Sequence, residues 1–190
     1  MWLISTSMSS NSRPMTVTEM SIIKRMVLLL LLVSGIRDAG AQAFDGNFDF
    51  KLYAGYMTVD FDPGFEIGAD YGCNDWLSLG TGVRYRIADK SKFDEPPQGM
   101  DGFDVKAHAY IHGQHLLGLP SWLDVYAGPF VGFHTGGMCG GVRMNFSEWI
   151  GVYADCAHPL FNTFKNKSND DLGLYRGHTV ISVGLTVNLE

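Results

Sequence analysis

Apolar and polar residues alternate one by one along about eight stretches of this 190-residue chain. In residues 76–87 (WLSLGTGVRYRI), for example, Leu79 and Val83 share one face, while Arg84 lies on the other. A period of two predicts β-strands with one apolar and one polar face. The predicted strands cover residues 47–58, 65–72, 76–87, 103–112, 123–133, 138–146, 149–157 and 180–189. Most are close to the ~10 residues of a tilted strand that crosses a membrane.

The connections between these strands alternate in length. Those at one end, residues 72–75, 113–121 and 147–149, are tight or moderate, and no helix is predicted there. Those at the other end cover residues 59–63, 88–102, 134–137 and 158–177, and all but the third are predicted to be longer. This asymmetry is typical of membrane barrels with both termini on one side. We therefore predict an all-β fold, an eight-stranded antiparallel up-and-down transmembrane β-barrel.

The polar face of the strands carries glycines and charges of both signs. Glycines gain nothing from facing water, but inside a narrow barrel they leave room for large neighbours. We therefore assign the polar face to the lumen and the apolar face to lipid. The predicted lumenal charge network comprises Asp49, Lys51, Glu66, Asp70, Arg84, Arg86, Asp104, Lys106, Asp124, Arg143 and Asp155. Within it, Glu66 is expected diagonal to Arg84, with Asp104 joining them from the next strand.

Two alternatives remain open for this architecture. A soluble, lipocalin-like barrel also alternates, with its apolar face inward. The lumenal charges form either a salt-bridged plug or the lining of a narrow pore, and the small interior of eight strands favours the plug. Aromatic residues near strand ends favour the membrane, because membrane barrels carry aromatic girdles at both interfaces. These are Phe48, Phe65, Tyr71, Trp76, Tyr85, Phe103, Trp122, Phe146 and Trp149.

Residues 24–43 (KRMVLLLLLVSGIRDAGAQA) have the features of a secretory signal peptide. They combine a basic start, a short apolar core, and Ala39 and Ala41 at the positions of an A-x-A cleavage site. We therefore divide the chain into an N-terminal extension and cleaved signal peptide, residues 1–41, and a barrel, residues 42–190. Together with the alternation, this predicts the outer membrane of a Gram-negative bacterium.

Charge and cysteine content exclude several classes of function. The formal net charge of −6 argues against nucleic-acid binding, which needs a basic face. Three cysteines at wide spacing fit neither a disulfide framework nor a zinc site. Cys139 and Cys156 fall on adjacent predicted strands, which would allow a disulfide, but their assignment to opposite faces argues against it. Their pairing stays an open alternative.

Candidate catalytic and metal-binding residues are poorly placed in the predicted strands. His108 and His112 share a face, but four residues along a strand span roughly 13 Å, which is too far for one metal ion. His178 and Ser182 are separated by a similar distance, so they cannot form a nucleophile–base pair. We expect no metal, no cofactor and no enzyme activity. A lipid-modifying outer-membrane enzyme is the third-ranked alternative, after a narrow pore.

The remaining candidates are the outer connections, including KSKFDEPPQGMDG and FNTFKNKSNDDLGLYRG. Connections on a rigid scaffold are where binding usually resides. We expect a monomer with a structural or surface-binding role through these loops. Its expected partners are outer-membrane lipids and, during biogenesis, the barrel-assembly machinery.

Four stretches of the chain resemble an uncharacterised outer-membrane β-barrel family of Bacteroidota, a domain of unknown function. They are AQAFDGNFDFKLYAGY, DYGCNDWLSLGTGV, FDVKAHA…LLGLPSWLDVYAGP and VGLTVNL. The resemblance covers nearly all of the chain after the signal peptide. It implies a barrel and an outer-membrane location, and it assigns no catalytic residues. The Leu189-Glu190 end departs from the terminal aromatic residue that is usual in such barrels.

Overall fold

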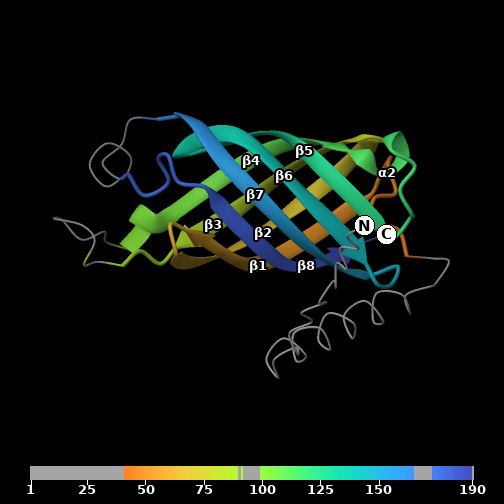
Figure 1. Cartoon of the computed structure of the whole chain (residues 1–190), viewed down its shortest axis with the longest axis horizontal. Helices are drawn as coiled ribbons and strands as arrows, with labels where there is room; N and C mark the ends of the chain where they lie inside the picture. The colour runs from red at the N-terminus through yellow and green to blue at the C-terminus, as the bar shows by residue number, and fades with distance from the viewer. Residues whose placement is uncertain (1–40, 90, 92–98, 165–172, 190) are drawn as a thin grey trace, which may run out of the picture. The chain divides into compact units, whose positions relative to one another are not determined.

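The computed structural model describes residues 41–89, 91, 99–164 and 173–189. The predicted signal peptide lies almost wholly outside these residues. Eight antiparallel strands form one closed barrel in which each strand pairs with the next and β8 returns to β1. Figure 1 shows the strands crossing the barrel at a steep tilt. They are β1 (Phe50–Val59), β2 (Asp62–Asn74), β3 (Leu77–Arg86), β4 (Phe103–His112), β5 (Leu123–Gly132), β6 (Thr135–Asn145), β7 (Ile150–Asn162) and β8 (Val180–Asn188).

The alternation of the sequence becomes the alternation of burial along each strand. In β8, Ser182 and Thr186 are fully buried, whereas Val183 and Leu185 are 50 % and 58 % exposed on the outer surface. In β2 the exposed Ile67 follows the buried Glu66. The polar face is therefore the inside of the barrel and the apolar face the outside, and the predicted eight-stranded fold is confirmed.

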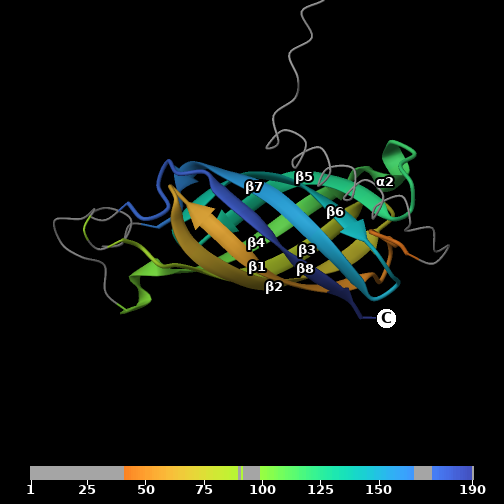
Figure 2. The same cartoon turned by 60° about the horizontal axis from the view of Figure 1, so that its bottom comes forward.

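The barrel closes without a free edge along its seam. β1 and β8 lie side by side (Figure 2), with Lys51 opposite Asn188 and Val59 opposite Val180. Closure satisfies the backbone groups of both strands, which an open sheet would leave unpaired. β1 begins and β8 ends at the same end of the barrel, called the terminal end below. The opposite end, which carries the β3–β4 and β7–β8 connections, is called the loop end.

Two predicted loops at the loop end are tight turns. The β1–β2 connection is only Asp60–Phe61, with φ of 50° and 65°, the left-handed pair that a two-residue hairpin requires. The β5–β6 connection is also two residues long, at 133–134. The expected longer loop at 59–63 is therefore wrong. β7 in turn continues to Asn162, well past the predicted end of that strand at residue 157.

The terminal end carries a short helix that the sequence pattern did not predict. This helix, α2 (Gly113–Leu116), opens the β4–β5 connection and lies at one end of the barrel in Figure 1. A short 3-10 turn, η2 (Gly99–Gly102), precedes β4 at the loop end. In the described part of the chain, no helix is both long and apolar enough to span a membrane.

Glycines of the polar face make room for interior side chains. A Cβ on Gly68 or on Gly82 would collide with the ring or hydroxyl of Tyr53. Tyr53 is 6 % exposed and its ring meets that of Tyr153 edge-on, with centroids 5.6 Å apart. Glycine on β2 and β3 thus lets a large aromatic ring lie flat across the lumen.

Candidate functional site

The lumen of the barrel is the most polar part of the described chain, and its charges are arranged in layers. Nearest the terminal end, Lys51 Nζ lies 2.8 Å from Asp49 Oδ1 and donates a hydrogen bond of 2.8 Å to Asn188 Oδ1. Lys51 is 1 % exposed, although it is only the second residue of β1. Its charge is therefore compensated inside the barrel, as a buried ammonium group requires.

The next layer is built around His112 on β4. Its Nδ1 lies 2.6 Å from Asp124 Oδ2, and its Nε2 lies 2.8 Å from the hydroxyl of Ser78. The second oxygen of Asp124 accepts the backbone N–H of Gln114 at 3.0 Å. Three strands and α2 are thereby joined by one carboxylate and one imidazole, both fully buried.

In the middle of the barrel, two carboxylates of β2 hold nitrogen-bearing side chains of β4 and β6. Asp70 lies 2.6 Å from Arg143 Nη2 and 2.5 Å from His108 Nε2. Glu66 lies 3.1 Å from Lys106 Nζ and accepts a hydrogen bond of 2.8 Å from the hydroxyl of Tyr153. These pairs cross the lumen, so they lock strands that are not neighbours.

Nearer the loop end, two arginines of β3 are held by separate carboxylates. Arg84 donates to Asp104 from Nε at 2.7 Å, and Arg86 donates to Asp62 from Nη2 at 2.6 Å. Arg84 is directly opposite Glu66 in the β2–β3 register, so the expected diagonal placement is wrong. Asp104 does join Arg84 from β4, as predicted.

The eleventh predicted charge, Asp155, has a different environment. It is 8 % exposed and sits opposite Ser182 across β7 and β8. Its Oδ1 has no hydrogen-bond partner among the described residues. Asp155 faces a small cavity of ≈ 10 Å³ whose wall includes Tyr110 and Tyr126. That volume holds about one water molecule, so this cavity is too small to be an open channel.

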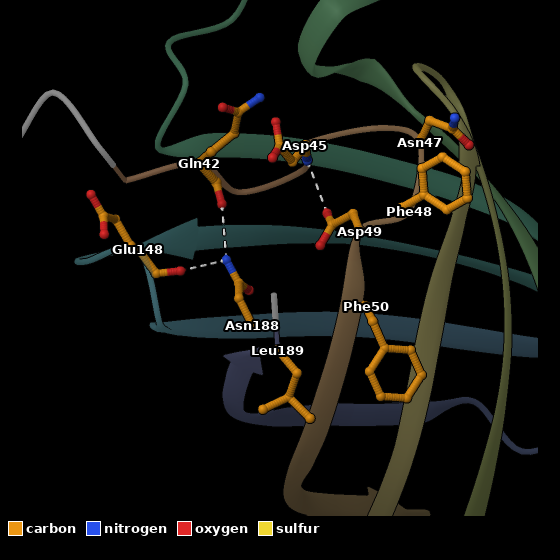
Figure 3. Close-up of a pocket in the computed structure, with 9 residues that line it drawn as sticks. All are labelled: Gln42, Asp45, Asn47, Phe48, Asp49, Phe50, Glu148, Asn188 and Leu189. Carbon is orange, nitrogen blue, oxygen red and sulfur yellow. Dashed lines mark hydrogen bonds between the residues drawn. The ribbon is translucent and has the colours of Figure 1, made fainter.

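The terminal end of the lumen is closed by the segment that precedes β1. Phe44 is 1 % exposed and stacks on His112, with ring centroids 3.6 Å apart and planes 3° from parallel. Its backbone N–H donates to Gln114 Oε1 at 2.9 Å. In Figure 3 the same segment runs beside the end of β8, where Asn188 donates to the carbonyls of Gln42 and Glu148.

A shallow hollow of ≈ 280 Å³ lies outside this closure. Its wall includes Asp45, Asp49 and Glu148, and Figure 3 shows Phe48 and Phe50 at its rim. The backbone N–H of Asp45 donates to Asp49 Oδ2 at 2.9 Å, so part of this acidic group serves to hold the segment itself.

The loop end is closed by residues of the β7–β8 connection. Leu174 and Tyr175 are fully buried, and Arg86 Nη1 donates to the carbonyl of Leu174. The ring of Tyr175 lies 4.8 Å from the guanidinium carbon of Arg84, and its hydroxyl donates to Gly102 O at 2.7 Å. Burial raises the pKa of the Tyr175 hydroxyl above its ordinary value, so it stays a neutral donor.

The other sequence candidates are not brought together. Cys139 is buried, Cys156 is exposed and both are free, so no disulfide joins them. Cys156 lies opposite Gly140, the residue that follows Cys139, so the two cysteine side chains point to opposite faces of the sheet. Ser182 is inside the barrel, whereas His178 lies at the loop end, 3.9 Å from Asp60. Among the described residues, no cluster of His, Cys, Asp and Glu is arranged to hold a metal ion.

Sequence reasoning missed some members of the network and both closures. Asp62 could have been found, because it continues the even-numbered polar face of Glu66 and Asp70 by two steps. Phe44 and Tyr175 could not, since neither lies on an alternating segment. The β-sheet pattern carries no information on how a connection folds back into the lumen.

Comparison with known proteins supports the fold and assigns a family. The chain is similar to a de novo designed transmembrane β-barrel, at 10% identity over 76% of this chain and 98% of that one, with a TM-score of 0.52. A second designed barrel, TMB2.3, solved by NMR in solution, gives 10% identity, 77% and 98% coverage and a TM-score of 0.50. The N-terminal β-barrel domain of Pseudomonas aeruginosa OprF gives 12% identity, 76% and 100% coverage and 0.49.

No curated protein matches the sequence. Residues 35–189 match the profile of a family of unknown function, DUF6646. This match includes all eight strands of the barrel. The chain therefore belongs to the DUF6646 family.

Proposed function

We propose that this protein is a non-conducting outer-membrane barrel that holds its loop end at the cell surface as a binding surface. The observation that carries this proposal is the filled lumen. Paired charges and tyrosines occupy the interior, the central cavity is ≈ 10 Å³, and Phe44 and Tyr175 close the two ends. A barrel whose interior is filled in this way is suited to act as an anchor and scaffold.

The outside of the barrel supports membrane insertion. Apolar side chains are exposed on every strand, and soluble monomers rarely expose an apolar surface that extends this far. Representative members, one from each strand, are Leu52, Ile67, Leu79, Val105, Val131, Met138, Ile150 and Leu185, which are 41–59 % exposed. Thr81 is a polar residue on this outer face, and its hydroxyl donates a hydrogen bond of 3.0 Å to Lys106 O. A polar group that is satisfied within the protein is tolerated in lipid.

The soluble-barrel alternative is disfavoured by the same geometry. A lipocalin-like barrel buries its apolar face and exposes its polar face. Here Arg84, Asp104 and Lys106 are 0–3 % exposed, while Phe65 and Trp149 are each 54 % exposed. Exposed aromatic residues near strand ends are typical of the aromatic girdles that membrane barrels carry at the lipid–water interfaces.

Conductance in planar lipid bilayers tests the scaffold against the pore. The wild-type protein is expected to give no discrete current steps, because paired charges and tyrosine rings fill the described part of the lumen. The double variant Tyr53→Ala/Tyr153→Ala removes the two rings that cross the lumen and is expected to conduct. Discrete steps from the wild type, at a size similar to those of the double variant, would show that the lumen is a pore.

A further inference from the structure

β7 projects beyond its neighbour at the loop end. It pairs with β6 as far as Asn162 opposite Thr135, but with β8 only as far as Ala157 opposite Val180. Residues 158–162 of β7 therefore have no partner on β8 within the described residues. The register of β6 and β7 also shifts between Gly136 and Gly137, which places Leu160 in a bulge.

A groove of ≈ 360 Å³ lies beside this projecting part of β7. It is lined by Pro159, Leu160, Phe161, Asn162, Arg176 and Gly177. Pro159 has no N–H and the bulge disturbs the backbone, so the groove is poorly suited to the addition of another strand. Leu160 and Phe161 are instead 65 % and 55 % exposed, and they give the groove an apolar side.

Arg176 gives the groove a cationic side, and its exposure is exceptional among the described residues. Within residues 41–89, 91, 99–164 and 173–189, it is the one lysine or arginine outside the lumen. The other five, Lys51, Arg84, Arg86, Lys106 and Arg143, are 1–3 % exposed. No ion pair or side-chain hydrogen bond is formed by the Arg176 guanidinium within the described part of the chain, and Arg176 is exposed in the wall of the groove.

The position of the groove along β7 matches the polar edge of a membrane. A membrane-spanning strand uses about 9–11 residues. Counting from Ile150, which follows the exposed Trp149, that span ends near His158 to Leu160. His158 itself is exposed and bonds the hydroxyl of Thr179 at 2.9 Å, which is consistent with a polar environment. The groove thus lies at the height of lipid headgroups on the loop side.

We propose that this groove binds the phosphate-bearing headgroup of an outer-leaflet lipid, with Arg176 on the phosphate and Leu160 and Phe161 against the lipid's apolar part. Guanidinium groups bind phosphate through paired N–H donors. An apolar wall at the same depth favours a lipid over a free anion. This inference rests on the proposed membrane location and names the chemistry that the loop end recognises.

Native mass spectrometry of the detergent-solubilised mature protein tests the proposal. The probe is a bisphosphorylated, acylated glucosamine disaccharide (lipid A), and the matched probe is the same lipid without phosphates. Wild type is expected to retain the phosphorylated lipid, and Arg176→Ala to lose about tenfold in affinity, the effect of one charge-assisted contact. Arg176→Lys is expected to fall between them, because it keeps the charge but loses the paired donors.

A charge-relocated variant separates the groove from net charge. Arg176→Ala/Met100→Arg restores the total charge at an exposed site of η2, where Met100 is 70 % exposed. It is expected to bind as weakly as Arg176→Ala. Binding restored to the wild-type level would overturn the proposal, as would equal retention of the dephosphorylated lipid. Inorganic phosphate at millimolar concentration that displaces the lipid would also overturn it, by assigning the site to a free anion.

The membrane proposal and the groove proposal fail in different ways. Each variant is first tested for heat-modifiable gel migration and for recovery in an outer-membrane fraction. Wild type in the soluble fraction would contradict the proposed function itself. Membrane-inserted, non-conducting protein that binds lipid equally with and without Arg176 would contradict the groove alone.

Discussion

Removal of the Asp104 carboxylate is expected to cost about 3–5 kcal/mol of unfolding free energy, the usual effect of breaking a buried ion pair. Asp104 is 0 % exposed and its carboxylate accepts from Arg84 Nε at 2.7 Å and from the His134 backbone N–H at 3.0 Å. Asp104→Ala leaves the Arg84 guanidinium, 1 % exposed, without its carboxylate. The cost therefore comes mainly from an uncompensated cation.

Urea unfolding of protein reconstituted in lipid vesicles, followed by tryptophan fluorescence and by gel migration, measures this cost. With an m-value of about 2 kcal/mol/M, the midpoint for Asp104→Ala is expected to fall by about 1.5 M or more. The double variant Arg84→Met/Asp104→Leu removes both charges and refills the space. It is expected to lose about 2 kcal/mol less than the sum of the two single changes, Arg84→Met and Asp104→Leu.

Additive losses in that cycle would refute the reasoning, because they would mean that Arg84 and Asp104 do not depend on each other. A midpoint unchanged by Asp104→Ala would refute it as well. Such a result would show that water reaches the pair and that the lumen is not sealed at this level.

Three further changes test other parts of the structure. Ile67→Lys, near the middle of β2 on the apolar face, is expected to cost about 2–4 kcal/mol of unfolding free energy in vesicles. Ile67→Val is expected to stay within about 1 kcal/mol of the wild type. Equal unfolding midpoints of the two variants would place this face in water. Gly80→Ala puts a Cβ against His108 and Asp70 and is expected to cost about 2 kcal/mol of unfolding free energy in the same urea assay. In the control Gly140→Ala, the nearest contact of the new Cβ would be 3.6 Å, so this change is expected to be neutral within about 0.5 kcal/mol. A neutral Gly80→Ala would contradict a tightly packed lumen. Phe44→Ala removes the ring that stacks on His112 and is expected to cost about 3 kcal/mol of unfolding free energy. The backbone amides of residues 41–45 are expected to exchange hydrogen faster, which mass spectrometry measures. Unchanged exchange would show that this segment is held in place without Phe44.

The sequence predicts the strands and their sidedness well, because both depend on local alternation. Tyr53 is inside and Leu52 outside for the reason that adjacent side chains of a strand point to opposite faces. The glycines on the polar face, such as Gly68, also carry their reason in the sequence, since a narrow barrel must make room for rings.

Pairing across the lumen could not be predicted in the same way. The sequence places Glu66, Arg84 and Lys106 on one face, but only the register and the shape of the closed barrel show that Lys106 lies 3.1 Å from Glu66. Connection lengths misled for a related reason. Asp60 and Phe61 form a two-residue turn in a left-handed conformation that bulky residues seldom adopt, so their types give little signal for it.

The two closures depend on tertiary contacts alone. Phe44 is fixed by a ring on β4 and an amide on α2, and Tyr175 by a carbonyl of η2 and a guanidinium on β3. No local pattern specifies these partners, which are separated from each residue by tens of positions in the chain.

In the proposed orientation, the apolar face of the barrel meets lipid and the polar face does not. Nuclear Overhauser effects between side-chain methyl groups and lipid acyl chains, in reconstituted protein, test it most directly. Strong effects are expected for Thr81, which is exposed on the outer face, and for Val183, which is 50 % exposed, and none for Thr186, which is 0 % exposed. Acyl-chain contacts at Thr186 with none at Thr81 and Val183 would contradict the account.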